Sequence, residues 1–241
     1  MTSDLKIGLQ QSYDEIYNIY RLLGKSPDGK VFKGSDAYIT EPNNPVESDA
    51  ARDLVKRAME SDELLYVVAI GEITNVASAI MMEPELIKKI VVWLADQPMH
   101  WPQAIEFNLG QDTIASQFMF DCGVPLVLVP CMSVASHLTT TAPELNAMLN
   151  GKSRIGTYLS EIAISQLDEE AAANMLALFR FTYLKGLDDY DQELIDNMPI
   201  RSMACSRIIW DISTIGYIIN PNWCPSTLVP APHFITAHIN G

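Results

Sequence analysis

The stretch from Leu64 to Asn108 constrains the fold of this chain more than any other. It contains two continuous apolar runs, 65–70 and 90–94, which are typical of strands buried on both faces. Between them, a glycine turn and the apolar spacing of residues 74–82 predict a short helix. This order predicts a β-α-β unit with a right-handed crossover. In open α/β sheets, ligands bind beyond the carboxyl ends of such strands.

The rest of the chain continues the alternation of helices and strands. Helices are predicted at 9–24, 49–59, 112–120, 143–150, within 155–184 and at 208–219. Further strands are predicted at 126–129 and, as short pieces, at 31–32 and 227–229. The pattern predicts an α/β fold with an open, mainly parallel sheet and flanking helices. Because no Gly/Ser linker or repeat interrupts it, we expect residues 1–241 to form a single domain.

Composition argues against several classes of function. The 16 Lys and Arg residues against 30 Asp and Glu residues leave a net charge of −14. Such a surface repels phosphate backbones, so we expect no nucleic-acid partner. The four cysteines form no CxxC pair, which favours reduced thiols in a cytoplasmic protein. We expect no membrane partner either, because no apolar run reaches the roughly 18 residues that span a bilayer.

Polar side chains gather in the loop 96–108, directly after a predicted strand. Glu106 and Asn108 are two residues apart, and on an extended segment their side chains would point the same way. A carboxylate beside an amide suits the hydroxyls of a sugar, and His100 with Trp101 could form a wall of that site. The alternative is a solvated loop whose Glu106 and Asn108 cap the following helix.

Other candidate residues follow other predicted strands or begin a helix. The carbonyl of Ile70, before Gly71, is a candidate ligand for a hard cation such as Ca²⁺, or part of an ordinary turn. Asp211 is a second candidate metal ligand, or a carboxylate favoured by the helix dipole. His137 is a candidate catalytic residue or a structural histidine. The chain has no P-loop, GxGxxG, GxSxG or HExxH motif, which argues against kinases, dinucleotide enzymes, serine hydrolases and zincins.

The segment YVVAIGEITNVA, from Tyr66 to Ala77, resembles the nucleoside hydrolase family of inosine–uridine-preferring N-ribohydrolases. The resemblance extends to Glu83-Pro84-Glu85 and, with the family's order and spacing, to Glu106-Phe107-Asn108. It continues through residues 121–130 and through Trp210-Asp211 to Asn220-Pro221, so it covers nearly the whole chain.

The resemblance implies calcium-dependent hydrolysis of a small-molecule nucleoside to ribose and free base, in purine or pyrimidine salvage. By the same resemblance, a Ca²⁺ ion lies at the carboxyl edge of the sheet, with the Ile70 carbonyl and Asp211 as ligands. Glu106, Asn108 and His100 would hold the ribose, and Trp210 and His137 would lie on the leaving-group side. The metal would lower the pKa of the attacking water.

The chain also departs from the family pattern. Family members begin with a strand ending in DxDxGxDD, which supplies most calcium ligands and the general base, and this sequence lacks it. We therefore expect the first strands to be missing, calcium binding to be impaired and activity to be weak or absent. Exposed strand edges favour a homo-oligomer. The alternative is an inactive, truncated paralogue that binds a sugar or a partner subunit.

Overall fold

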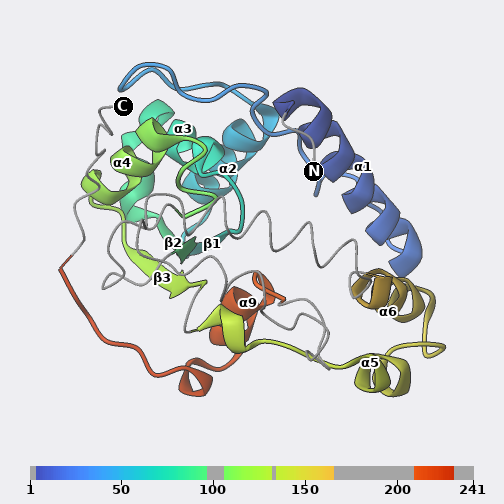
Figure 1. The fold of residues 1–241 in the computed structure, drawn as a ribbon. Helices are drawn as coiled ribbons and strands as arrows, with labels where there is room; N and C mark the ends of the chain where they lie inside the picture. The colour runs from blue at the N-terminus through green and yellow to red at the C-terminus, as the bar shows by residue number, and fades with distance from the viewer. Residues whose placement is uncertain (1–3, 97–105, 132–133, 166–208, 231–241) are drawn as a thin grey trace, which may run out of the picture. The chain divides into compact units, whose positions relative to one another are not determined.

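The computed structural model describes residues 4–96, 106–131, 134–165 and 209–230 (Figure 1). The chain forms two compact units. The first consists of Met1–Asp96, Phe107–Val129 and Thr214–Gly241, and the second of Gln97–Glu106 and Pro130–Ser213. Both units combine segments that are distant in the sequence, and the single domain stays a prediction.

Among the described residues, the sheet has three strands in the order β1-β2-β3. Its strands are β1 (Leu65–Ala69), β2 (Ile90–Asp96) and β3 (Leu126–Pro130). β1 and β2 are parallel, with Leu65 opposite Ile90, and the amide of Val92 donates to the carbonyl of Pro125 at 2.9 Å. The predicted open, parallel α/β architecture is thereby confirmed.

Three helices of the first unit form its core together with the sheet. They are α2 (Asp49–Glu60), α3 (Thr74–Met82) and α4 (Thr113–Asp121), and α3 contacts both of the others. Figure 1 shows all three on the same side of the strands. Ile80, Ile90 and Met119, from a helix, a strand and a helix, are each at most 1% exposed. The β-α-β crossover β1-α3-β2 is as predicted.

The prediction that β1 is covered on both faces is wrong. Tyr66, the second residue of this strand, is 58% exposed. β1 lies at one edge of the described sheet and pairs with β2. An apolar run predicts a strand well, but it does not say whether the strand lies at the edge or at the centre of its sheet.

Local capping explains where the helices begin and end. α1 (Leu5–Leu23) starts four residues before the predicted position because the Asp4 carboxylate accepts hydrogen bonds from the amides of Lys6 and Ile7. It ends at Gly24, whose φ of 65° closes the last turn. Ser48 caps α2 through the amide of Ala51, as predicted. These caps act within three positions in the sequence, and the prediction is right at Ser48 and Gly24 but misses the cap at Asp4.

The remaining elements among the described residues are short helices. They are η1 (Pro84–Lys88), η2 (Ala135–His137), α5 (Ala142–Met148), α6 (Arg154–Ser165), α9 (Ile212–Ile219) and η4 (Pro221–Trp223). The predicted strands at 31–32 and 227–229 are wrong: both segments are irregular, and Leu228 is fully exposed. Neither segment pairs with a strand of the described sheet. Residues with high strand propensity do not form a strand unless a neighbouring strand pairs with them. The predicted helix beyond 165 lies outside the described residues.

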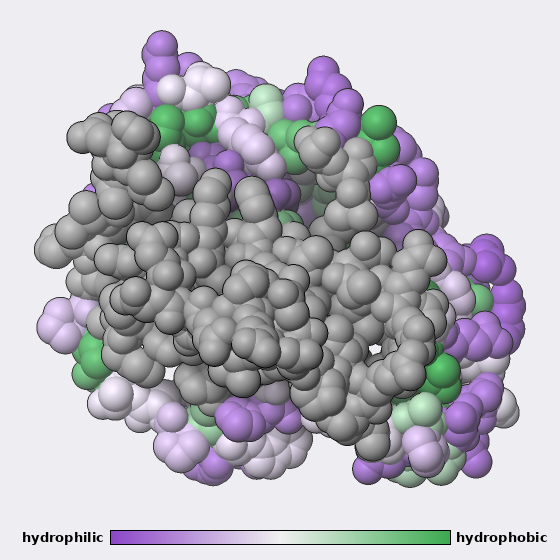
Figure 2. Space-filling model, viewed as in Figure 1, coloured by the Kyte–Doolittle hydropathy of each residue, from purple (hydrophilic) through white to green (hydrophobic). Residues whose placement is uncertain are grey.

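Apolar side chains are exposed at several places on the described surface. Figure 2 shows hydrophilic residues over most of what is visible of the described chain, with hydrophobic residues singly or in small groups. On α9, Ile212, Ile215 and Ile219 are 51%, 44% and 68% exposed. The homo-oligomer stays a prediction. In the part of the chain that the structure describes, no helix has the length and apolar character needed to cross a bilayer.

Candidate functional site

Glu106 is a buried carboxylate. Its residue is 5% exposed, and the thiol of Cys131 donates a hydrogen bond to its Oε1 across 3.8 Å. Cys131 follows the last residue of β3 and is itself 6% exposed. A buried carboxylate is costly unless hydrogen bonds compensate for the lost water, so this thiol is part of what holds Glu106 in place. The sequence drew attention to Glu106 but did not single out Cys131.

Asn108 lies in a turn and not on the extended segment that the sequence predicts. Residues 107–111 form consecutive turns, and the carbonyl of Asn108 accepts from the amide of Gln111 at 3.3 Å. The argument that strand alternation aligns Glu106 with Asn108 is therefore wrong. The alternative, in which these two residues cap the next helix, is also wrong, because Asp112 is the N-cap of α4. Their binding of ribose stays a prediction.

Asp112 is a buried side chain that sequence reasoning passed over. It is 2% exposed, and its Oδ1 accepts from the amide of Ala115 at 2.9 Å. Its Oδ2 accepts from the hydroxyl of Thr74 at 2.6 Å and from the amide of Ile39 at 3.0 Å. An Asp before an apolar helix signals an N-cap, but that signal says nothing of Thr74 or Ile39.

Asn75, which follows Thr74 in the segment YVVAIGEITNVA, accepts several hydrogen bonds from the loop before α2. Its Oδ1 accepts from the amide and hydroxyl of Ser35, at 2.9 and 3.3 Å, and from the hydroxyl of Ser48 at 2.8 Å. Gly34 passes so close that a Cβ there would lie 2.8 Å from Asn75 Nδ2. Asn75 thus attaches the loop before α2 to the start of α3, and Thr74 joins the same helix start to Asp112. Their role in this structure is to order the chain around the β1–α3 turn.

Tyr38 lies close to two segments that carry predicted site residues. Its hydroxyl donates to Gln111 Oε1 at 3.1 Å, in the turn that begins after Glu106. Burial raises the pKa of Tyr38, and the negative charges of Glu72 and Asp112 raise it further. Glu72 follows the Ile70-Gly71 turn directly. The phenol is therefore a neutral hydrogen-bonding group beside both turns.

The described residues do not fit the calcium site that the family resemblance implies. Ile70 follows the end of β1, whereas Asp211 is exposed and belongs to the turn before α9. Ca²⁺ takes 6–8 oxygen ligands, and one carbonyl with one carboxylate leaves most of them unfilled. Within residues 4–96, 106–131, 134–165 and 209–230, no three His, Cys, Asp or Glu side chains gather as a metal site.

The other predicted residues occupy varied positions. Trp210 is half-buried, and its carbonyl accepts from the hydroxyl of Ser213 at 2.7 Å at the start of α9. His137 ends η2 and is exposed. His100 lies outside the described residues. An indole only donates, so Trp210 is not a proton shuttle for a leaving base.

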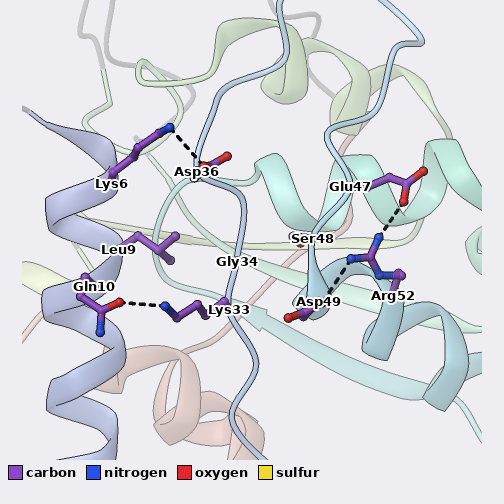
Figure 3. Close-up of a pocket in the computed structure, with 10 residues that line it drawn as sticks. All are labelled: Lys6, Leu9, Gln10, Lys33, Gly34, Asp36, Glu47, Ser48, Asp49 and Arg52. Atoms are coloured by element: carbon purple, nitrogen blue, oxygen red, sulfur yellow. Dashed lines mark hydrogen bonds and ion pairs between the residues drawn. The ribbon is translucent and has the colours of Figure 1, made fainter.

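A hollow of about 430 Å³ lies apart from all the predicted site residues of the first unit. Figure 3 shows its walls, which come from α1, the loop that follows it and the start of α2. Most of its charged side chains bind one another: Lys6 pairs with Asp36 at 3.4 Å, and Arg52 with Glu47 and Asp49 at 2.6 and 3.1 Å. The remaining one, Lys33, donates to Gln10 Oε1 at 2.8 Å. Because these charges are already paired on an open surface, the hollow has few free charged groups to bind a ligand.

Replacing Cys131 tests how Glu106 is held. We expect Cys131→Ala to weaken the predicted ribose binding about threefold to tenfold, because one hydrogen bond to a charged acceptor is lost. Cys131→Ser keeps a donor and should stay within about threefold of the wild type. Isothermal calorimetry with ribose measures both. Cys122→Ala is the matched control, because the Cys122 thiol donates to the carbonyl of Met119. Equal affinities for all variants would show that Cys131 does not orient Glu106.

Comparison with known proteins identifies a family that matches nearly the whole chain. A family model described as inosine-uridine preferring nucleoside hydrolase matches residues 8–229. The chain is 27% identical over 139 residues to a probable uridine nucleosidase 2 of Arabidopsis thaliana, covering 56% of this chain and 43% of that one. It is 31% identical over 135 residues to the pyrimidine-specific ribonucleoside hydrolase RihA of Klebsiella pneumoniae, covering 54% and 42%.

A solved structure supports the fold. The purine-preferring ribonucleoside hydrolase from Gardnerella vaginalis superposes with a TM-score of 0.64 at 18% identity, covering 92% of this chain and 71% of that one. At this identity the likeness concerns the fold. The chain spans less than half the length of the two curated relatives above.

Proposed function

Because the chain belongs to the inosine-uridine preferring nucleoside hydrolase family, we propose that the protein acts on ribonucleosides and hydrolyses the N-glycosidic bond to ribose and free base. The observation that carries the proposal is the buried carboxylate of Glu106, 5% exposed, in the Glu-Phe-Asn segment. A carboxylate held away from water by a fixed donor is preorganised to accept hydrogen bonds from sugar hydroxyls.

In this proposal the chain's own residues bind and orient the sugar. Glu106 accepts hydrogen bonds from ribose hydroxyls, and Asn108 offers an amide donor and acceptor to them. In the reaction, water adds to C1′ as the bond to the base nitrogen breaks, and the base takes up a proton. The transition state resembles an oxocarbenium ion, so contacts to the hydroxyls that tighten as positive charge develops on the ring lower the barrier.

Calcium enters the proposal only as the cation that the family resemblance implies, and it would supply an activated water where it binds. The described donors do not make up its site, and no three metal-binding side chains gather among them. We therefore expect the 241-residue chain to bind ribose and to hydrolyse nucleosides slowly.

Ribose release from inosine and uridine tests this proposal. Both substrates are needed because the relatives are named for pyrimidine and for purine nucleosides. With Ca²⁺ present, we expect kcat below about 0.1 s⁻¹, two decades under the median enzyme. Glu106→Gln should lower that rate further, and calorimetry should detect ribose binding with or without Ca²⁺. Turnover near about 10 s⁻¹ would contradict the proposal that the metal donors limit this chain. No binding of ribose would contradict the sugar site itself.

A further inference from the structure

The carboxylate of Asp112 joins three segments of the first unit. One is the start of α4, whose Ala115 amide donates to Oδ1 at 2.9 Å. The second is the first residue of α3, Thr74, whose hydroxyl donates to Oδ2 at 2.6 Å. The third is the loop before α2, in which the amide of Ile39 donates to Oδ2 at 3.0 Å. Ile39 and Thr74 are 73 and 38 residues from Asp112, so a local cap is only part of its role.

Two of these segments adjoin predicted site residues, and the third carries Tyr38, which contacts the turn after Glu106. Thr74 opens α3 four residues after Ile70, the predicted carbonyl ligand. Asp112 follows the turn that contains Asn108. In this turn the Gln111 amide donates to the Asn108 carbonyl, and the Ser116 hydroxyl donates to the Leu109 carbonyl at 2.9 Å. Beside Ile39, the Tyr38 hydroxyl donates to Gln111 Oε1. A shift of Asp112 would therefore move both turns together.

The chemistry of the junction requires a carboxylate. Each carboxylate oxygen of Asp112 accepts a hydrogen bond from a backbone N–H, so an NH₂ group in place of either oxygen would face another donor. After Asp112→Asn, the new amide nitrogen would face either the Ile39 or the Ala115 N–H, whichever way the side chain turned. Asp112 also sits at the amino end of α4, close to the first residue of α3, and the dipoles of both helices favour a negative charge there.

We propose that Asp112 is a positioning residue for the sugar site, because it couples the Asn108 turn to the β1–α3 turn and to the loop at Ile39. The expected effect on ribose binding rests on the proposed function, whereas the coupling of the three segments rests on the hydrogen bonds of Asp112. Asp112 itself is 2% exposed and acts through Asn108. Loss of the carboxylate loosens all three segments at once and weakens ribose binding.

Amide hydrogen exchange with a ribose titration tests the coupling. Asp112→Asn should speed exchange about tenfold or more in peptides covering 35–47, 71–78 and 107–116, and raise the ribose Kd about fivefold or more. Thr74→Val should loosen the same three segments to a smaller extent, and Thr74→Ser should restore wild-type behaviour. Asp4→Asn is the matched control, because Asp4 caps α1 in the same way through Lys6 and Ile7. Its effect should be confined to α1.

Three results would overturn the proposal. The first is faster exchange confined to the first turn of α4, which reduces Asp112 to a local cap. The second is unchanged ribose affinity while all three segments loosen. The third is a wild-type chain that binds no ribose although exchange is coupled, which removes the proposed function and leaves only the mechanical junction. If Asp112→Asn fails to fold, Thr74→Val carries the same test.

Discussion

Glu106→Gln is expected to raise the ribose Kd about a hundredfold. Hydrogen bonds to a charged group contribute about 1.5–3 kcal/mol, and each 1.4 kcal/mol is tenfold in affinity. The substitution keeps the size of a side chain that is 5% exposed, so it removes the charge without opening a cavity. One of the two acceptor oxygens becomes a donor and can no longer accept a bond from a sugar hydroxyl.

Calorimetry on variants of equal melting behaviour measures this effect. Glu161→Gln makes the same change on the exposed face of α6 and should leave the Kd within about twofold, because exposed carboxylates far from a ligand contribute little. Glu106→Asp keeps the charge but shortens the side chain, so it tests position alone. A Kd within about threefold of the wild type for Glu106→Gln would show that this carboxylate does not bind the sugar.

Asn75→Ala is expected to lower the free energy of unfolding by about 3 kcal/mol. The substitution removes one acceptor that serves three donors, two on Ser35 and one on Ser48. The Ser35 hydroxyl keeps a second acceptor, the carbonyl of Val46 at 3.5 Å. Ser35 and Ser48 are 8% and 5% exposed, so the Ser35 amide and the Ser48 hydroxyl lose the Asn75 acceptor in a place that water reaches poorly. Each such group costs about 1–3 kcal/mol, part of which relaxation recovers. Ser48 also caps α2, so its displacement weakens that helix.

Urea denaturation followed by circular dichroism measures this change. Asn146→Ala on the exposed face of α5 is the matched control and should stay within about 0.5 kcal/mol of the wild type. A loss as small as that of the control would show that the loop before α2 keeps its place without Asn75. A lower m-value for Asn75→Ala would instead indicate that the loop is already released in the native state.

The local elements of this fold could be predicted closely. The helix Thr74–Met82 and the Ser48 cap appear where the sequence predicts them, and the strands Leu65–Ala69, Ile90–Asp96 and Leu126–Pro130 lie within two residues of prediction. The wrong predictions also have physical reasons. Residues 31–32 and 227–229 have strand-forming residues but pair with no strand of the described sheet, and residues 107–111 turn where an extended segment was expected.

The candidate site was predictable only in part. Glu106 was recognised from its segment, whereas its contact with Cys131, 25 residues away, was not. Thr74 and Asn75 were recognised as part of a family pattern, and only their partners show that they hold the chain together. Nothing in the order of residues pairs Asn75 with Ser35, which is 40 positions earlier.

The sequence by itself determined the succession of the main helices and strands, because apolar periodicity acts over a few neighbouring residues. It also indicated the family, through the separate signal of motifs such as YVVAIGEITNVA and Glu106-Phe107-Asn108 in the right order. Only the tertiary structure decided that β1 is an edge of the described sheet, that Glu106 is buried against Cys131, and that Asp112 holds Ile39 and Thr74. These facts depend on residues that become neighbours when the chain packs. A buried polar group takes whichever partner packing brings to it.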